Sequence, residues 1–270
     1  MDESEELQQG AFPNDEKTQK YGNLLFLLQS EPRHIAHLCR LITMAEIDTL
    51  LQTVMFTIYG NQYESRDEHL LLTMFQSVLT YQFEHTADYS SLLRANTPAS
   101  RMMTTYTRRG PGQSYLRVIL AERINSLIEL KDLDLEINPL RVYQRVIEQC
   151  EEDGKDFPDG MRKGVTAEEA AENQMVQQLI EPRIQMLHEI ANSFLDTIIR
   201  GLEEIPYGIR WICKQIRSLS RRKYPEAQDH TICTLIGGFF FLRFINPAII
   251  SPISYMLIDS APEDCFNLLP

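Results

Sequence analysis

Two arginines of this chain lie in settings where a guanidinium could act on a neighbouring group. The first, Arg243, interrupts the apolar run FFFLRFINPAIISP, which covers residues 239–252. An unpaired charge inside an apolar segment is costly, so Arg243 needs a partner. Its planar head carries several N–H donors, which suit the backbone carbonyls of a neighbouring loop. The alternative is a structural arginine that satisfies the end of its own helix.

The second arginine, Arg94, comes just before a predicted helix. Asn96-Thr97-Pro98 is typical of a helix N-terminus, with Thr97 as the cap and Pro98 in the first helical position. Arg94 is therefore expected in a loop, from which its side chain can project. Taken alone, it is more typical of an ordinary solvated loop arginine, because most surface arginines have no chemical role. It opens a basic segment, residues 94–121, that contains no Asp or Glu and also holds Arg101, Arg108, Arg109 and Arg117.

A second group of basic residues follows helical spacing. Arg210, Lys214, Arg217 and Arg221 are separated by four, three and four positions, so a helix would place them on one face. The opposite face would carry Ile209, Ile212, Ile216 and Leu219. A basic face on an acidic protein favours an acidic partner and electrostatic steering of the encounter. A plain amphipathic helix is the alternative.

The elements that must position these groups are predicted to be helices throughout, because alternating strand patterns are almost absent. Thr166-Ala-Glu-Glu169 is a capping box, which predicts a helix N-terminus. Pro247 has no amide hydrogen, so the helix that carries Arg243 is expected to end near Ile245. Gly237 and Gly238 have no side chains and are expected to let another element pack closely. The fold class is therefore all-α.

Composition limits the classes of function. The chain has 270 residues and a net charge of −12, which argues against a general nucleic-acid binder. Five scattered cysteines without a C-x-x-C pair suit a reducing compartment and predict neither a zinc site nor a redox site. No apolar run is judged to approach 18 residues, so no membrane span is predicted. Residues 1–20 are acidic and polar, and we expect a flexible leader there.

Four segments of the sequence together resemble one family. Phe241-Leu242-Arg243 with Asn246-Pro247-Ala248 is similar to the FLR…NPA signature of Ras GTPase-activating proteins (Ras-GAPs) and close to the version in neurofibromin. Leu93–Ser100 resembles the family's finger loop. Ile205–Arg210 and Tyr21–Leu25 resemble the IQGAP branch. The resemblance covers residues 21–270, in the family's order. It implies a helical bundle with a central catalytic lobe and an extra lobe, formed by a helical insertion at about residues 123–200.

The resemblance also implies a function. The domain would stimulate GTP hydrolysis by a Ras-type small GTPase, as an activator without hydrolase activity of its own. Arg94 would be the arginine finger inserted in trans, Arg243 would hold the finger loop through its backbone, and Asn246 would lie near the catalytic glutamine of the GTPase. The implied GTPase-binding residues are Ala95, Thr97, Leu242, Arg210, Lys214, Arg217 and Arg221. The chain would need no cofactor or metal, since GTP and Mg²⁺ belong to the GTPase. We expect it to be cytoplasmic and to act at the inner membrane face, where lipidated Ras resides.

Some departures from the family pattern leave alternatives open. IQGAP proteins have threonine at the finger position and bind Rho-type GTPases without accelerating hydrolysis, whereas this chain has Arg94, like the IQGAP-related Ras-GAPs of fungi. The residue before it is Leu93, where many active members have phenylalanine. The chain ends at Pro270, before the family's last helices, so we expect a C-terminally truncated domain. The alternatives are an inactive IQGAP-like scaffold for a GTP-loaded Rho-type GTPase and a helical adaptor that binds phosphoinositides or nucleic acid.

Overall fold

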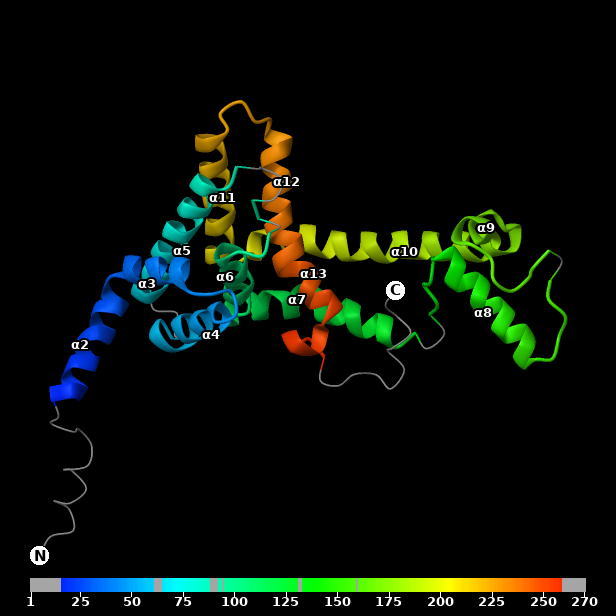
Figure 1. Ribbon diagram of the computed structural model, residues 1–270, viewed down its shortest axis with the longest axis horizontal. Helices are drawn as coiled ribbons and strands as arrows, with labels where there is room; N and C mark the ends of the chain where they lie inside the picture. Colours follow the sequence, from blue (N-terminus) through cyan, green and yellow to red (C-terminus); the bar gives the residue numbers. More distant parts are fainter. Residues whose placement is uncertain are drawn as a thin grey trace, which may run out of the picture. The chain divides into compact units, whose positions relative to one another are not determined.

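The computed structural model describes residues 16–60, 65–87, 92–93, 95–130, 133–158 and 160–258. Within these ranges every regular element is a helix and no strand occurs, which confirms the all-α class (Figure 1). The chain divides into two compact units. The first combines the N-terminal part up to Tyr115 with Ile205–Ile250, and the second combines Leu116–Glu204 with the residues from Ser251 onward.

The first unit carries most of the predicted site. Its elements are α2 (Glu16–Ser30), α3 (Pro32–Leu41), α4 (Ile47–Gln52), the π-helical η1 (Thr53–Ile58), α5 (Ser65–His85), α6 (Pro98–Thr107), α11 (Tyr207–Lys223), α12 (Asp229–Phe239), the π-helical η3 (Phe240–Ile245) and α13 (Asn246–Ile250). The last five residues of the predicted leader, 16–20, are helical and begin α2, while residues 1–15 lie outside the described residues.

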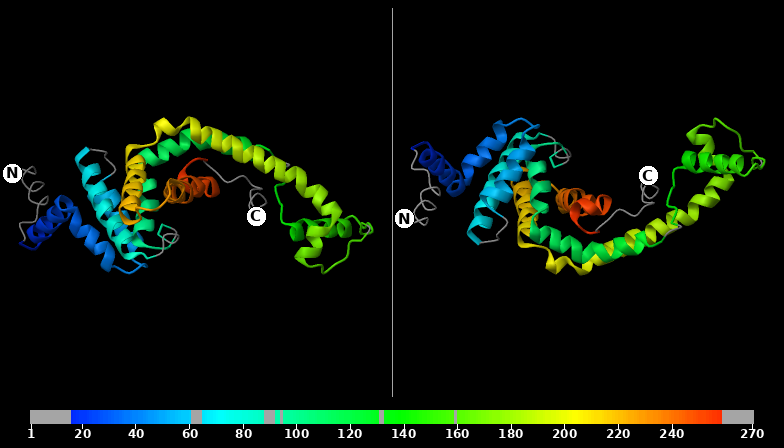
Figure 2. Two further views of the ribbon diagram at one scale, coloured as in Figure 1. Left: turned by 90° about the horizontal axis from the view of Figure 1, so that it is seen from above. Right: turned by 90° about the horizontal axis from the view of Figure 1, so that it is seen from below.

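The centre of the first unit is α5, which packs against α3, α6 and α11 (Figures 1 and 2). Its buried side chains are Leu71, Leu72, Met74, Phe75, Val78, Leu79 and Phe83. Successive members of this set lie one, two, three or four positions apart, which places them on one side of a helix. Burying such an apolar face is the main force that holds the helix in place.

The apolar run around Arg243 is helical for longer than predicted. The expectation that the helix ends near Ile245 was wrong, because α12, η3 and α13 follow one another without a break from Asp229 to Ile250. Pro247 cannot donate to the carbonyl of Arg243 four residues earlier. The Thr107 hydroxyl lies 3.4 Å from that carbonyl and also 2.8 Å from the Thr104 carbonyl, so a donor from α6 is available to replace the missing amide.

Two further features of this run bear on the sequence predictions. Among the described residues, no atom lies within 4 Å of a Cβ added at Gly237 or Gly238, so the part of the chain that the structure describes shows no close packing at these glycines. The run Asp229–Ile250 has a mean hydropathy of 1.7 over 18 residues and could cross a membrane by length and composition. Packing inside the first unit accounts for its apolar face equally well, since Ile232, Leu235, Phe239 and Phe244 are buried there.

The second unit has its own apolar cluster. Its elements are the later part of α7 (Gly110–Ile128), α8 (Pro139–Glu152), α9 (Ala167–Glu172), α10 (Gln174–Arg200) and the 3-10 helices η2 (Leu202–Glu204) and η4 (Pro252–Tyr255). The buried cluster consists of Val142, Tyr143, Ile147, Met161, Ala170, Val176 and Ile180. The capping box predicted at Thr166 and Glu169 is present at the start of α9. This unit includes the range 123–200, for which an extra helical lobe is predicted.

Candidate functional site

The predicted finger loop leads directly into α6. Thr97 caps this helix as predicted, because the Ser100 amide donates to Thr97 Oγ1 at 3.3 Å and the Thr97 amide donates to Ser100 Oγ at 3.0 Å. Leu93 is buried, whereas Ala95 and Asn96 are exposed. Arg94, the predicted finger, lies outside the described residues. The structure describes the residues on both sides of it, Leu93 and Ala95, together with the contacts of these flanking segments.

Arg243 makes a contact on the N-terminal side of position 94. Its Nη2 atom donates to the backbone carbonyl of Leu93 at 3.3 Å. Helix α6 packs against η3, and this places the Arg243 side chain beside the loop. The neighbours Phe240, Phe244 and Ile245 point into the core, so the π-helical turn leaves Arg243 on the partly open side.

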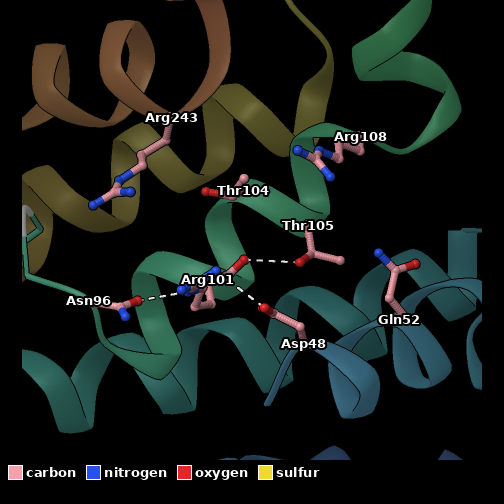
Figure 3. Close-up of a pocket in the computed structure, with 8 residues that line it drawn as sticks. All are labelled: Asp48, Gln52, Asn96, Arg101, Thr104, Thr105, Arg108 and Arg243. Carbon is pink, nitrogen blue, oxygen red and sulfur yellow. Dashed lines mark hydrogen bonds and ion pairs between the residues drawn. The ribbon is translucent and has the colours of Figure 1, made fainter. Parts of the chain in front are cut away.

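The two segments border one polar cavity of about 510 Å³. Its lining is drawn in Figure 3 and consists of Asp48, Gln52, Asn96, Arg101, Thr104, Thr105, Arg108 and Arg243. Three of these eight side chains are guanidiniums and one is a carboxylate, so the lining carries a net positive charge. Such a cavity can receive acidic or phosphate-like groups.

The basic face predicted on α11 is present. Arg210, Lys214, Arg217 and Arg221 are all exposed, and Ile209, Ile212, Ile216 and Leu219 are all buried. Arg221 pairs with Asp229 at 2.9 Å, and Arg217 Nη2 lies 3.8 Å from the sulfur of Cys233. On η3, Leu242 keeps 49% of its surface exposed, which leaves it accessible to a partner.

The sequence matches the model of one protein family. The sequence model described as "GTPase-activator protein for Ras-like GTPase" matches residues 74–269. This range contains the predicted finger loop, α6, α11 and the whole run from α12 to α13. The chain belongs to the Ras-GAP family.

Curated relatives from the family cover most of the chain. It is 33% identical over 247 residues to the Ras GTPase-activating-like protein gapA of Dictyostelium discoideum, which covers 91% of this chain and 28% of the relative. It is 34% identical over 242 residues to rgaA of the same organism, with 90% and 29% covered. Human IQGAP2 is 29% identical over 240 residues, with 88% and 15% covered. The chain thus spans less than a third of the length of these relatives.

The structure describes the positions of Asn246 and Ala95, and their roles toward a GTPase stay predictions. Asn246 begins α13 and is half-buried, one turn beyond Arg243. Ala95 is exposed in the loop beside position 94. Their approach to a GTPase, like that of the basic face of α11, concerns a partner chain and is part of the function that we propose for this Ras-GAP domain.

Sequence reasoning grouped Arg101 with other basic residues and gave it no role. In the structure Arg101 Nε donates to Asn96 Oδ1 at 2.7 Å, and Arg101 Nη1 lies 3.2 Å from Asp48 Oδ2 (Figure 3). The spacing of Asn96 and Arg101 at a helix N-terminus could have indicated the first contact. Asp48 is 53 positions away, so no local pattern could have indicated the second.

Arg109, from the same basic segment, has a structural environment. Only 3% of its side chain is exposed, and its Nη1 atom lies 2.5 Å from Glu68 Oε2. Nη2 donates to the Gly60 carbonyl at 3.1 Å, and the Tyr106 hydroxyl donates to the same Glu68 carboxylate. Arg109 therefore ties the end of α6 to α5. It is not a surface group available to a partner.

Proposed function

We propose that this Ras-GAP domain stimulates GTP hydrolysis by a Ras-type small GTPase, with Arg94 as a finger inserted in trans. The observation that carries the proposal is the hydrogen bond from Arg243 to Leu93, directly before Arg94 in the chain. Family membership supports it, because the matched model describes activators of Ras-like GTPases. Because Arg243 is hydrogen-bonded to the residue directly before Arg94, it lies where it could orient the finger.

The chemistry follows from charge. A Ras-type GTPase hydrolyses GTP slowly because negative charge on the phosphate oxygens is poorly neutralised in its own site. A guanidinium supplied at Arg94 would stabilise that charge as the terminal bond breaks. Fingers of this kind contribute about 10³–10⁵-fold in rate, a magnitude established for Ras and its activators and not calculated from this chain. Lysine should replace arginine poorly, because the planar fork matches phosphate oxygens.

The docking surface that we propose combines Leu242 on η3 with the basic face of α11. Acidic switch regions of a GTPase would be attracted by that face and would cover the exposed Leu242 side chain. Asn246 would then approach the catalytic glutamine, with Ala95 and Thr97 beside the nucleotide. GTP and Mg²⁺ would be contributed by the GTPase. Binding to a lipidated GTPase would bring the domain to the cytoplasmic face of a membrane.

A second candidate function is a scaffold that binds a GTP-loaded Rho-type GTPase without accelerating hydrolysis. The similarity to human IQGAP2 favours it. The residue at position 94 separates the two functions, since Arg94 can supply a catalytic cation and the threonine of IQGAP proteins cannot.

A single-turnover assay tests the proposal. GTP hydrolysis by Ras, Rap and Rho-type GTPases is followed with the wild-type domain and with the Arg94→Ala, Arg94→Lys and Arg94→Thr variants. We expect acceleration of at least one GTPase by the wild type, loss of that acceleration in all three variants, and binding of the GTP-loaded GTPase within a few-fold in each. If the wild type binds a GTPase and leaves its hydrolysis rate unchanged, the scaffold function replaces the proposed one.

A further inference from the structure

We propose that Arg101, anchored by Asp48, is a second positioning residue for the finger, holding the loop on the opposite side of Arg94 from Arg243. This inference rests on the proposed function for its kinetic consequence. The Arg101 side chain reaches back from the first turn of α6 and donates through Nε to Asn96 Oδ1 at 2.7 Å. Its other end lies 3.2 Å from the carboxylate of Asp48 on α4.

The two contacts bracket the predicted finger. Arg243 bonds to the backbone one residue before Arg94, and Arg101 bonds to the side chain two residues after it. A short loop held at one point can still rotate about that point. A second point on the other side removes much of this freedom, which is the pre-organisation that a group inserted into a foreign active site requires.

The two supports come from different parts of the first unit. The Arg243 contact depends on η3, whereas the Arg101 contact depends on α6 and α4. Figure 3 shows them on opposite sides of the polar cavity, with Arg243 above and the Asn96–Arg101–Asp48 chain below. Loss of one support therefore leaves the other intact, and the two should be separable by mutation.

Asp48 has a defined part in this arrangement. The side chains of Arg101 and Asp48 are 42% and 55% exposed, and arginine has many rotamers of similar energy when it is solvated. The carboxylate selects the rotamer in which Nε faces Asn96. An ion pair with this exposure contributes little to global stability. Its removal should therefore change the order of the loop while the stability of the fold changes little.

The guanidinium suits this task better than an ammonium. Arg101 uses two different nitrogens, Nε toward Asn96 and Nη1 toward Asp48, and the rigid plane fixes the angle between the two bonds. Lysine has one nitrogen and a flexible stem. Arg101→Lys should therefore keep the charge but recover only part of the positioning.

The first experiment separates positioning from binding. Arg101→Ala and Asp48→Asn are compared with the wild type in single-turnover GTP hydrolysis at saturating domain concentration and in a direct binding assay with the GTP-loaded GTPase. We expect the maximal rate to fall about tenfold for Arg101→Ala and less for Asp48→Asn, because small misplacements of a catalytic group cost large factors in rate. Affinity should stay within about twofold and the melting temperature should not change measurably.

The matched control is Arg33→Ala on α3. Arg33 also lies 3.2 Å from a carboxylate, that of Glu31, and its side chain is 76% exposed. The Arg33→Ala substitution removes one positive charge from the same unit and leaves the loop contacts intact. The maximal rate of this variant should therefore equal that of the wild type. The double variant Asp48→Asn with Arg101→Ala should lose no more rate than Arg101→Ala alone, because both residues act through one contact.

The second experiment does not depend on catalysis. Amide hydrogen exchange of the peptide that covers residues 92–100 is measured in the free domain. Exchange should be faster in Arg101→Ala than in the wild type, intermediate in Arg101→Lys and unchanged in Arg33→Ala. If the wild type accelerates no GTPase, the proposed function fails and this exchange alone decides whether Arg101 holds the loop.

Two results would overturn the positioning role. One is an Arg101→Ala variant with wild-type maximal rate and wild-type exchange. The other is a variant that loses activity only through weaker binding of the GTPase, which would make Arg101 a contact residue for the partner.

Discussion

The guanidinium of Arg243 donates a hydrogen bond at 3.3 Å to the backbone carbonyl of Leu93, which lies 150 positions earlier in the sequence. Leu93 is itself buried, with 4% of its surface exposed. The bond thus joins the π-helical turn η3 to a loop residue that packing already holds. The backbone of Leu93, the residue that precedes Arg94 in the sequence, is therefore held by a hydrogen bond as well as by packing.

Removal of this bond should lower the rate of stimulated GTP hydrolysis. Arg243→Ala is expected to reduce the maximal single-turnover rate by about 10- to 100-fold, because the finger is no longer pre-positioned. Arg243→Lys keeps the charge and loses the planar donor, so its rate should lie between the two. The exposed Arg123 on α7 provides a control, and Arg123→Ala should leave the rate unchanged. A wild-type rate in Arg243→Ala would contradict the positioning role.

Reversal of charge on α11 should slow the encounter with a GTPase. Lys214→Glu and Arg217→Glu are each expected to lower the association rate by a few-fold to about tenfold at low salt, with the difference shrinking as ionic strength rises. Stopped-flow association at several salt concentrations measures this effect. The basic face would have no part in docking if both variants associated at the wild-type rate at low salt.

The ion pair of Arg109 with Glu68 should matter for stability. Arg109→Met is expected to cost about 3–5 kcal/mol, because it leaves the Glu68 carboxylate, 20% exposed, without its partner. Adding Glu68→Gln should restore part of the loss, since the amide oxygen can still accept from the Tyr106 hydroxyl without a charge. Thermal and denaturant unfolding measure both variants. Equal stability of the single and double variants would show that the unpaired carboxylate is not the cause.

Gly208 should tolerate no side chain. An added Cβ would lie 1.5 Å from the Tyr106 hydroxyl oxygen and 2.6 Å from its Cζ, so Tyr106 would have to move away from Glu68. We expect Gly208→Ala to cost about 1–3 kcal/mol. Gly237→Ala is the matched control, because a Cβ there meets no atom of the described residues within 4 Å. In that open helical position alanine should stabilise the protein by about 0.5–1 kcal/mol. The two changes in unfolding free energy should therefore have opposite signs.

Cysteine reactivity should follow burial. Burial raises the pKa of the Cys39 and Cys213 thiols to about 11, so on the order of one thiol in a thousand is ionised at pH 8. Cys233 is exposed. Iodoacetamide at pH 8 should therefore modify Cys233 well before Cys39 and Cys213, and labelling of the latter two should rise with pH while the fold persists. Mass spectrometry of tryptic peptides gives the order, and equal rates would contradict it.

Local features of the sequence were sufficient for the helices and their faces. The Thr97 and Thr166 caps and the basic face of α11 depend on contacts within about one helical turn, so spacing along the chain predicts them. The same local reasoning failed at Pro247. It treated the missing amide as the end of a helix and could not include Thr107, a donor from another element.

By itself the sequence determined an all-α chain, its helix caps and the basic face of α11. Through resemblance it also predicted the roles that we propose for Arg94 and Arg243. Only the tertiary structure decided which carbonyl accepts the hydrogen bond from Arg243, that Arg101 contacts Asp48, and that Arg109 is buried against Glu68. The partners in these contacts are 150, 53 and 41 positions apart. Side-chain periodicity carries information over a few residues, whereas contacts at such separations depend on how the helices pack against one another.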